Sequence, residues 1–157
     1  MSVAFRRDSD EEHLEPKFEL PIAPGPNFVT PVGMAQIEAR VASLELALEQ
    51  ALEAGGTEDA VKELKRDLRY WRQRFSSAIP APAPAAGMVG IGTAVTFNLR
   101  GKSQTMTITG HDEADPAARK IAFSSPLARA LLGLEQGDFA DFGDEEEAIE
   151  VEAVSTQ

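Results

Sequence analysis

The stretch that decides the fold, residues 34–78, reads MAQIEARVASLELALEQALEAGGTEDAVKELKRDLRYWRQRFSSA. Apolar residues recur at alternating steps of three and four before the central glycine pair, at Met34, Ile37, Val41, Leu44, Leu48 and Ala51. The same spacing recurs after the glycines, at Val61, Leu64, Leu68, Trp71, Phe75 and Ala78. This is the seam spacing of a coiled coil, and the two seams mirror each other about Gly56. The pattern predicts an antiparallel helical hairpin over residues 30–79 with Gly55-Gly56 at its tip.

Residues that favour helix starts stand at both predicted starts. Thr30 and Pro31 suit the cap and the first position of the first helix. Thr57 suits the cap of the second helix, with Glu58 and Asp59 in its first turn. The first arm is net acidic and the second net basic, so the arms attract. Each seam spans a rod of roughly 26 Å at about 1.5 Å per residue.

Composition sets limits on the function. The chain has 157 residues, a net charge of −11 and no cysteine. The negative charge argues against indiscriminate DNA binding and against an anionic membrane surface. The missing cysteines exclude disulfides and thiol chemistry. No apolar run reaches the length of a membrane span, and residues 1–7 lack the apolar stretch of a signal peptide. We expect a soluble, cytoplasmic protein that has no membrane partner.

The rest of the chain divides by composition. Residues 1–29 show no period and contain four prolines, which predicts an extended or disordered tail. Residues 80–87 alternate proline and alanine, which is typical of a stiff linker. From residue 88 the period changes to two, and strands are expected at 95–99, 105–109, 120–123, 138–142 and 148–154. Ser125 and Pro126 begin a short helix between them. Residues 88–157 therefore predict an α+β domain in which one helix covers an antiparallel sheet.

No stretch spells out a complete active site, and we expect no cofactor and no resident metal. The carboxylates of Glu58 and Asp59 could complete a magnesium site of another protein, but dipole complementarity is a sufficient reason for them. His13 and His111 are expected to be ordinary polar residues, and Asp112, Glu113 and Asp115 a solvated turn. A basic face on the second helix could contact nucleic acid such as nascent RNA, or could simply be solvated. It comprises Lys62, Lys65, Arg66, Arg69 and Arg72.

Several runs in the second half resemble the C-terminal domain of the Gre transcription elongation factors, a bacterial family. They are GHDEAD at 110–115, KIAFSSPLARALLG at 120–133 and GD at 137–138. TPVG at 30–33, after NFV, also resembles the start of the Gre hairpin. The resemblance covers nearly all of residues 27–154. It implies an FKBP-like C-terminal domain that docks on RNA polymerase, and a hairpin that enters the secondary channel of the enzyme.

The resemblance also implies site residues. The docking surface maps to Ser124, Ser125, Pro126, Leu127 and Arg129. The acidic tip motif of cleavage-stimulating members is absent, because only Gly-Gly-Thr-Glu-Asp stands at 55–59. The hairpin is also shorter, as in the relatives named Rnk. We therefore expect a monomeric polymerase-binding regulator that is not itself an enzyme, with transcript-cleavage stimulation in doubt. The alternative is an FKBP-like prolyl isomerase or chaperone, which would need an aromatic-lined pocket.

Overall fold

The computed structural model describes residues 19–156. Most of the predicted tail and His13 lie outside the described residues. The chain divides into two compact units, one made of Met1–Gly25 with Gln36–Ser77 and the other of Pro26–Ala35 with Ala78–Gln157. In the part of the chain that is described, no helix is both long and apolar enough to cross a membrane.

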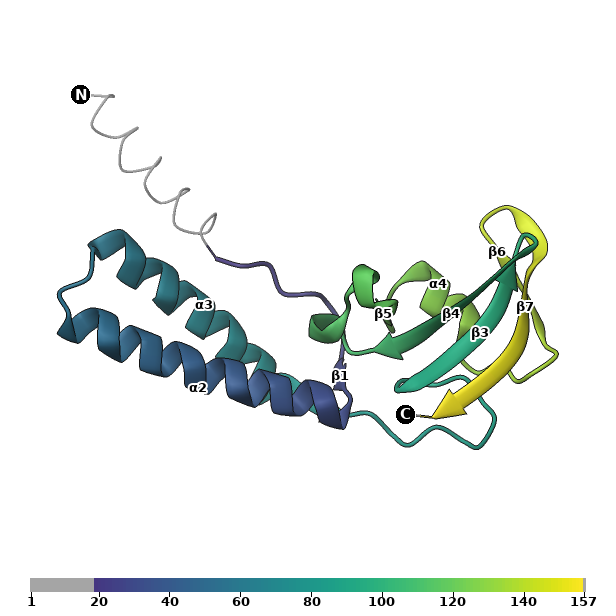
Figure 1. The fold of residues 1–157 in the computed structure, drawn as a ribbon, viewed down its shortest axis with the longest axis horizontal. Coiled ribbons are helices and arrows are strands. Elements are labelled where there is room, and N and C mark those ends of the chain that lie inside the picture. Colours follow the sequence, from purple (N-terminus) through teal and green to yellow (C-terminus); the bar gives the residue numbers. More distant parts are fainter. Residues whose placement is uncertain (1–18, 157) are drawn as a thin grey trace, which may run out of the picture. The chain divides into compact units, whose positions relative to one another are not determined.

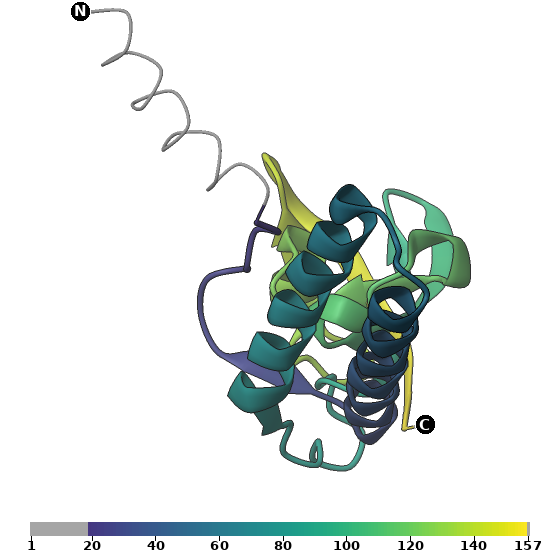
Figure 2. The same ribbon diagram turned by 90° about the vertical axis from the view of Figure 1, so that its left-hand side faces the viewer.

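Two long helices form an antiparallel hairpin, α2 (Pro31–Glu53) and α3 (Glu58–Ser77) (Figures 1 and 2). The turn between them contains Gly55 at φ +67°, a conformation that side chains disfavour. Thr57 caps α3 as the sequence predicts, because its Oγ1 accepts from the Ala60 amide at 3.2 Å.

The predicted seam is the buried side of the hairpin over most of its length. Ile37, Leu44 and Leu68 are buried, and the other seam positions apart from Phe75 are half-buried. Phe75 is 41% exposed, whereas Arg74 is only 2% exposed. The seam prediction is therefore wrong at this last turn. Arg74 and Phe75 lie three and four positions after Trp71, so both can lie on the same face of the helix as Trp71. The long aliphatic stem of Arg74 can be buried there.

Side-chain contacts join the two arms. Arg72 Nη2 on α3 lies 3.3 Å from Glu45 Oε1 on α2. The Arg40 guanidinium carbon of α2 lies 5.7 Å from the centroid of the Trp71 ring. These contacts match the predicted attraction between an acidic and a basic arm, with each exposed pair contributing modestly.

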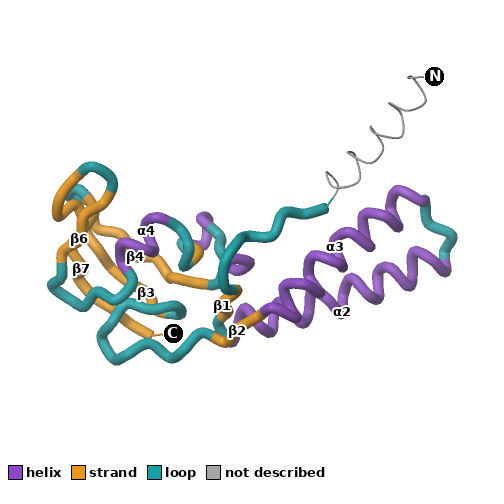
Figure 3. The backbone as a smooth tube through the Cα atoms, turned by 180° about the vertical axis from the view of Figure 1, so that it is seen from behind, coloured by secondary structure: helices purple, strands orange, loops and turns teal. Residues whose placement is uncertain are grey.

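A two-stranded parallel ladder lies where the chain enters and leaves the hairpin. Strand β1 (Asn27–Val29) pairs with β2 (Ala78–Pro80), and the Ala81 amide donates to the Val29 carbonyl at 2.9 Å (Figure 3). The expected tail therefore ends in a strand, and the expected linker begins in one. The tail prolines end at Pro26, which leaves the amides of β1 free for pairing.

The second unit contains a five-stranded sheet in the order β5-β4-β3-β7-β6. Its strands are β3 (Thr93–Leu99), β4 (Lys102–Thr109), β5 (Lys120–Ala122), β6 (Phe139–Phe142) and β7 (Glu145–Thr156). The expectation of an antiparallel sheet is wrong at one edge, because β5 runs parallel to β4. Two single-turn helices, η1 (His111–Glu113) and η2 (Pro116–Ala118), fill the connection. This crossover brings the chain back in its original direction, which a tight turn cannot do.

Helix α4 (Pro126–Leu131) covers one face of the sheet. Its side chains Ala128 and Leu131 are fully buried with Val95, Phe97, Ile108 and Ile149 in one cluster. Ser125 caps the helix as predicted, accepting from the Ala128 amide at 3.2 Å. The α+β class predicted from the sequence is confirmed, with a mixed sheet in place of an antiparallel one.

Candidate functional site

The tip carboxylates lie in the first turn of α3. Glu58 and Asp59 are both exposed, and Glu58 Oε1 lies 3.5 Å from the ammonium of Lys62 one turn away. An exposed pair of this kind, together with the helix dipole, gives both acids a structural role. Among residues 19–156, no three side chains of His, Cys, Asp or Glu form a group that could hold a metal ion.

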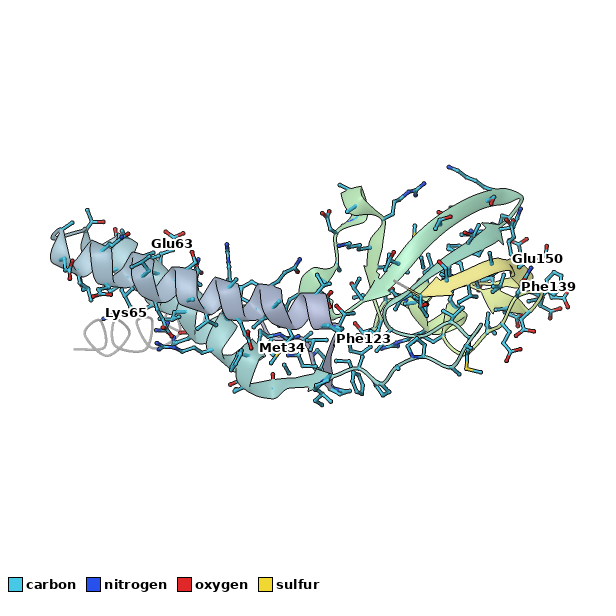
Figure 4. The ribbon with its side chains drawn as sticks, turned by 60° about the horizontal axis from the view of Figure 1, so that its bottom comes forward. Met34, Glu63, Lys65, Phe123, Phe139 and Glu150 are labelled. Atoms are coloured by element: carbon cyan, nitrogen blue, oxygen red, sulfur yellow. The ribbon has the colours of Figure 1, made fainter. Side chains whose placement is uncertain are left out.

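Most of the basic face on α3 is engaged by carboxylates of the same chain. Arg66 contacts Asp67 at 2.9 Å, and Arg69 makes a two-pronged contact with Glu19, its shorter arm 2.5 Å. Lys62 and Arg72 have the partners named above. Lys65, labelled in Figure 4, is exposed and has no ion pair within the described residues. Intramolecular pairing of four of the five cations leaves less free charge for phosphate than the sequence alone indicates.

The predicted docking segment combines structural and exposed residues. Ser125 is the cap of α4, and Leu127 packs against the core of the sheet unit. Pro126 and Arg129 are exposed, and Ser124 is half-buried. The helix starts at Pro126 with Ser125 as its cap, so Arg129 lies about one helical turn after the cap. The segment thus presents a proline ring and a cation on a rigid support, which suits a protein contact.

Sequence reasoning missed the role of Glu113. Its carboxylate accepts from the Thr30 amide at 3.2 Å, from the Thr30 hydroxyl, and from the Gly110 amide at 3.0 Å. The Thr30 hydroxyl in turn accepts from the Gly33 amide at 3.1 Å. One carboxylate therefore joins η1 to the start of α2, across 83 residues of sequence. This is a structural junction where a solvated turn was expected.

Two glycines make room for that carboxylate. A Cβ at Gly33 would lie 2.3 Å from Glu113 Cδ and Oε2. A Cβ at Gly110 would lie 2.6 Å from the Phe28 carbonyl oxygen and 2.9 Å from Glu113 Oε2. Because real Cβ atoms do not approach so closely, both positions require glycine in this arrangement. The sequence signal for this junction was that both segments, TPVG at 30–33 and GHDEAD at 110–115, resemble the Gre family.

The phenylalanines of the sheet unit do not gather around a pocket. Phe97 is fully buried, Phe123 and Phe142 pack against the core, and Phe139 is 52% exposed. The ring of Phe123 also meets that of Phe28 edge-on, with centroids 5.6 Å apart. Three of the four sheet-unit rings belong to the core and Phe139 is exposed, so they give no support to the prolyl-isomerase alternative.

Comparisons with known proteins place this arrangement in a family. The model for the C-terminal domain of the transcription elongation factors GreA and GreB matches residues 83–156. Transcription elongation factor GreA of Chloroflexus aurantiacus is 35% identical over 113 residues, which cover 68% of this chain and 71% of that protein. GreB of Neisseria meningitidis serogroup A is 34% identical over 102 residues, which cover 62% of each protein. The chain thus spans about three fifths of the length of this GreB relative.

A solved structure is also similar, that of GreA factor homolog 1 of Thermus thermophilus. It has 17% sequence identity and a TM-score of 0.39, with 83% of this chain and 99% of that chain covered.

Proposed function

Because the chain belongs to the GreA/GreB family of transcription elongation factors, we propose that it binds RNA polymerase and regulates transcription without being an enzyme itself. The observation that carries the proposal is the match over residues 83–156, which contain the segment SSPLAR at 124–129. In this proposal the sheet unit is the FKBP-like docking body. The hairpin enters the secondary channel of the core enzyme, as the Gre resemblance implies. Such a regulator acts as a monomer in the bacterial cytoplasm.

The docking surface is proposed to be Ser124, Ser125, Pro126, Leu127 and Arg129. The exposure of Pro126 and Arg129 supports direct contact by these two residues. Ser125 and Leu127 support the surface from beneath, by capping α4 and packing on the core. Exposed residues held on a buried support are the arrangement expected of an interface anchor.

Replacing Pro126 and Arg129 together by alanine is expected to weaken binding to core RNA polymerase about tenfold or more, as loss of an interface anchor does. The measurement is competition of the full-length variant against labelled wild-type protein. Arg119→Ala, an exposed arginine elsewhere in the same unit, is the matched control and should compete like the wild type. Equal competition by both variants would place the docking surface elsewhere.

The hairpin is proposed to act by occupying the channel. Glu58 and Asp59 supply the only carboxylates in the first turn of α3, and Glu58 already faces Lys62. The short rod and the missing tip motif support a short-hairpin member of the Rnk kind. Four of the five cations of the basic face are paired with carboxylates of this chain, so they add little to any contact with nascent RNA.

Transcript cleavage in a backtracked elongation complex is expected to rise little when the protein is added. A second magnesium ion would need carboxylates within about 2.0–2.1 Å of the metal, directly or through its waters. We expect the tip of this short hairpin to stop before it can supply them. The measurement is RNA shortening in a stalled complex, with the wild type and with Glu58→Ala plus Asp59→Ala. Strong cleavage by the wild type that the double substitution abolishes would make the tip catalytic.

A further inference from the structure

The hairpin of β6 and β7 holds an arginine between a phenylalanine and a glutamate. Phe142 on β6 and Glu145 on β7 are cross-strand neighbours. Arg100 lies with its guanidinium carbon 5.9 Å from the Phe142 ring centroid, and its Nε donates to Glu145 Oε2 at 2.6 Å. The ring face attracts the cation while the carboxylate accepts its N–H. In this arrangement the ring and the carboxylate both contact one arginine side chain.

A second cross-strand pair of the same composition lies on the same two strands. Phe139 on β6 faces Glu150 on β7 in the register of the ladder, and Figure 4 shows the two side chains together at this edge of the sheet. Phe139 is 52% exposed, and Glu150 is exposed. Within residues 19–156 no cation contacts Glu150. This second pair therefore has the ring and the carboxylate of the first pair without its arginine.

The neighbouring acids are engaged locally. Asp141 Oδ1 accepts from the Glu147 amide at 2.8 Å, and Glu152 Oε2 accepts from the Ser103 hydroxyl at 3.0 Å. No lysine or arginine stands between residues 130 and 157, so the nearby sequence offers no cation for Glu150. An exposed ring beside a free carboxylate is complementary to a cation from another molecule.

The pair lies on the face of the sheet away from α4. Ala140 and Phe142 pack against the core that contains Ala128 and Leu131 of that helix. Because successive side chains of a strand point to opposite faces, Phe139 points away from this core. A molecule bound at Phe139 and Glu150 thus does not displace one bound at residues 124–129.

We propose that Phe139 and Glu150 form a docking site for an arginine side chain of a partner protein. Arginine fits better than lysine, because its planar guanidinium can lie over the ring and donate to the carboxylate at once. Arg100 lies over the Phe142 ring and donates to Glu145 in this way. The site is separate from the proposed polymerase contact and does not depend on it.

The test is an NMR titration of the full-length ¹⁵N-labelled protein with the blocked peptide acetyl-Gly-Ser-Arg-Ser-Gly-amide. We expect saturable shifts centred on Phe139 and Glu150, and weaker binding for the peptide with lysine in place of arginine. Loss of the ring should weaken binding of the arginine peptide about two- to fivefold, the size of an exposed cation–π contact. Phe139→Leu keeps the apolar bulk without the aromatic face, and Glu150→Gln keeps the shape without the charge. Each should weaken binding by a similar factor.

Asp144→Asn is the matched control, since it removes one charge from the exposed turn of the same hairpin. It should leave the titration unchanged. Equal weakening by Asp144→Asn, equal binding of the two peptides, or shifts spread evenly over all the acidic residues would each overturn the proposal. Both site variants change exposed residues, and their unperturbed spectra away from β6 and β7 serve as the folding check.

Discussion

Replacing Gly33 by alanine is expected to lower the free energy of unfolding of the sheet unit by about 1–3 kcal/mol, the usual cost of overpacking. An ordinary glycine-to-alanine change within a helix has the opposite sign and stabilises by about 0.5–1 kcal/mol. The sign reverses here because the new Cβ would lie 2.3 Å from the Glu113 carboxylate. That carboxylate can move aside only by giving up its hydrogen bonds to Thr30 and Gly110.

The measurement is urea unfolding followed by circular dichroism, together with hydrogen exchange at the amides of Gly33 and Gly110. Glu113→Ala alone should cost about 1.5–3 kcal/mol, because the donors on the buried residues Thr30 and Gly110 lose a charged acceptor. In the double variant the steric conflict is gone, so its loss should be smaller than the two single losses combined. A more stable Gly33→Ala protein would mean that Glu113 is not held at this junction. Glu146→Gln, an exposed glutamate on β7, should have almost no effect.

Leu44→Ala should cost the hairpin about 2–5 kcal/mol, the range for a buried leucine, and toward its lower end because the rod is only two helices thick. Leu44 is 9% exposed, while Leu46 in the same helix is 55% exposed. Leu46→Ala should therefore change stability by less than about 0.5 kcal/mol, as surface substitutions usually do. The two variants make the same chemical change at positions that differ in burial. The difference between their losses of unfolding free energy therefore measures the contribution of packing at the seam.

Trp71 is the only tryptophan in the chain and lies half-buried on α3, so its emission reports on the hairpin. The midpoint of urea unfolding followed at this emission should fall clearly for Leu44→Ala and stay near the wild-type value for Leu46→Ala. Equal losses at the two positions would mean that the arms pair along another face.

The hairpin was predictable because its signal is local and repeated. Steps of three and four over both arms fix the buried face, and a glycine pair with a following threonine fixes the turn. The prediction fails at Phe75, because two adjacent residues, Arg74 and Phe75, can each occupy the seam face. Periodicity offers no means of choosing between them. The prediction also fails at Ala78, which lies in β2 and not in the helix.

Non-local pairing was not predictable in the same way. Strands β1 and β2 have three residues each and are separated by the whole hairpin, so neither shows a period of its own. The parallel pairing of β5 with β4 depends on the path of a connection that contains two single-turn helices. Glu113 was predicted to lie in a solvated turn, because its partner Thr30 is 83 residues away and no local pattern indicates the contact. The spacing of residues along the chain does not predict contacts of this kind.

The pairing of β1 with β2 makes the helical hairpin an insertion whose two ends are fastened side by side. Val29 and Pro80 are opposite each other in that ladder. Val29 lies two residues before the start of α2, and Pro80 lies three residues after the end of α3. Because the β1–β2 ladder holds only the two ends of the helical hairpin, it does not restrict the length of the helices between them. Whole heptads could be added to both arms, or another antiparallel hairpin could replace this one, without changing the β1–β2 ladder. The length of the hairpin and the way its base is attached can therefore change independently in this architecture.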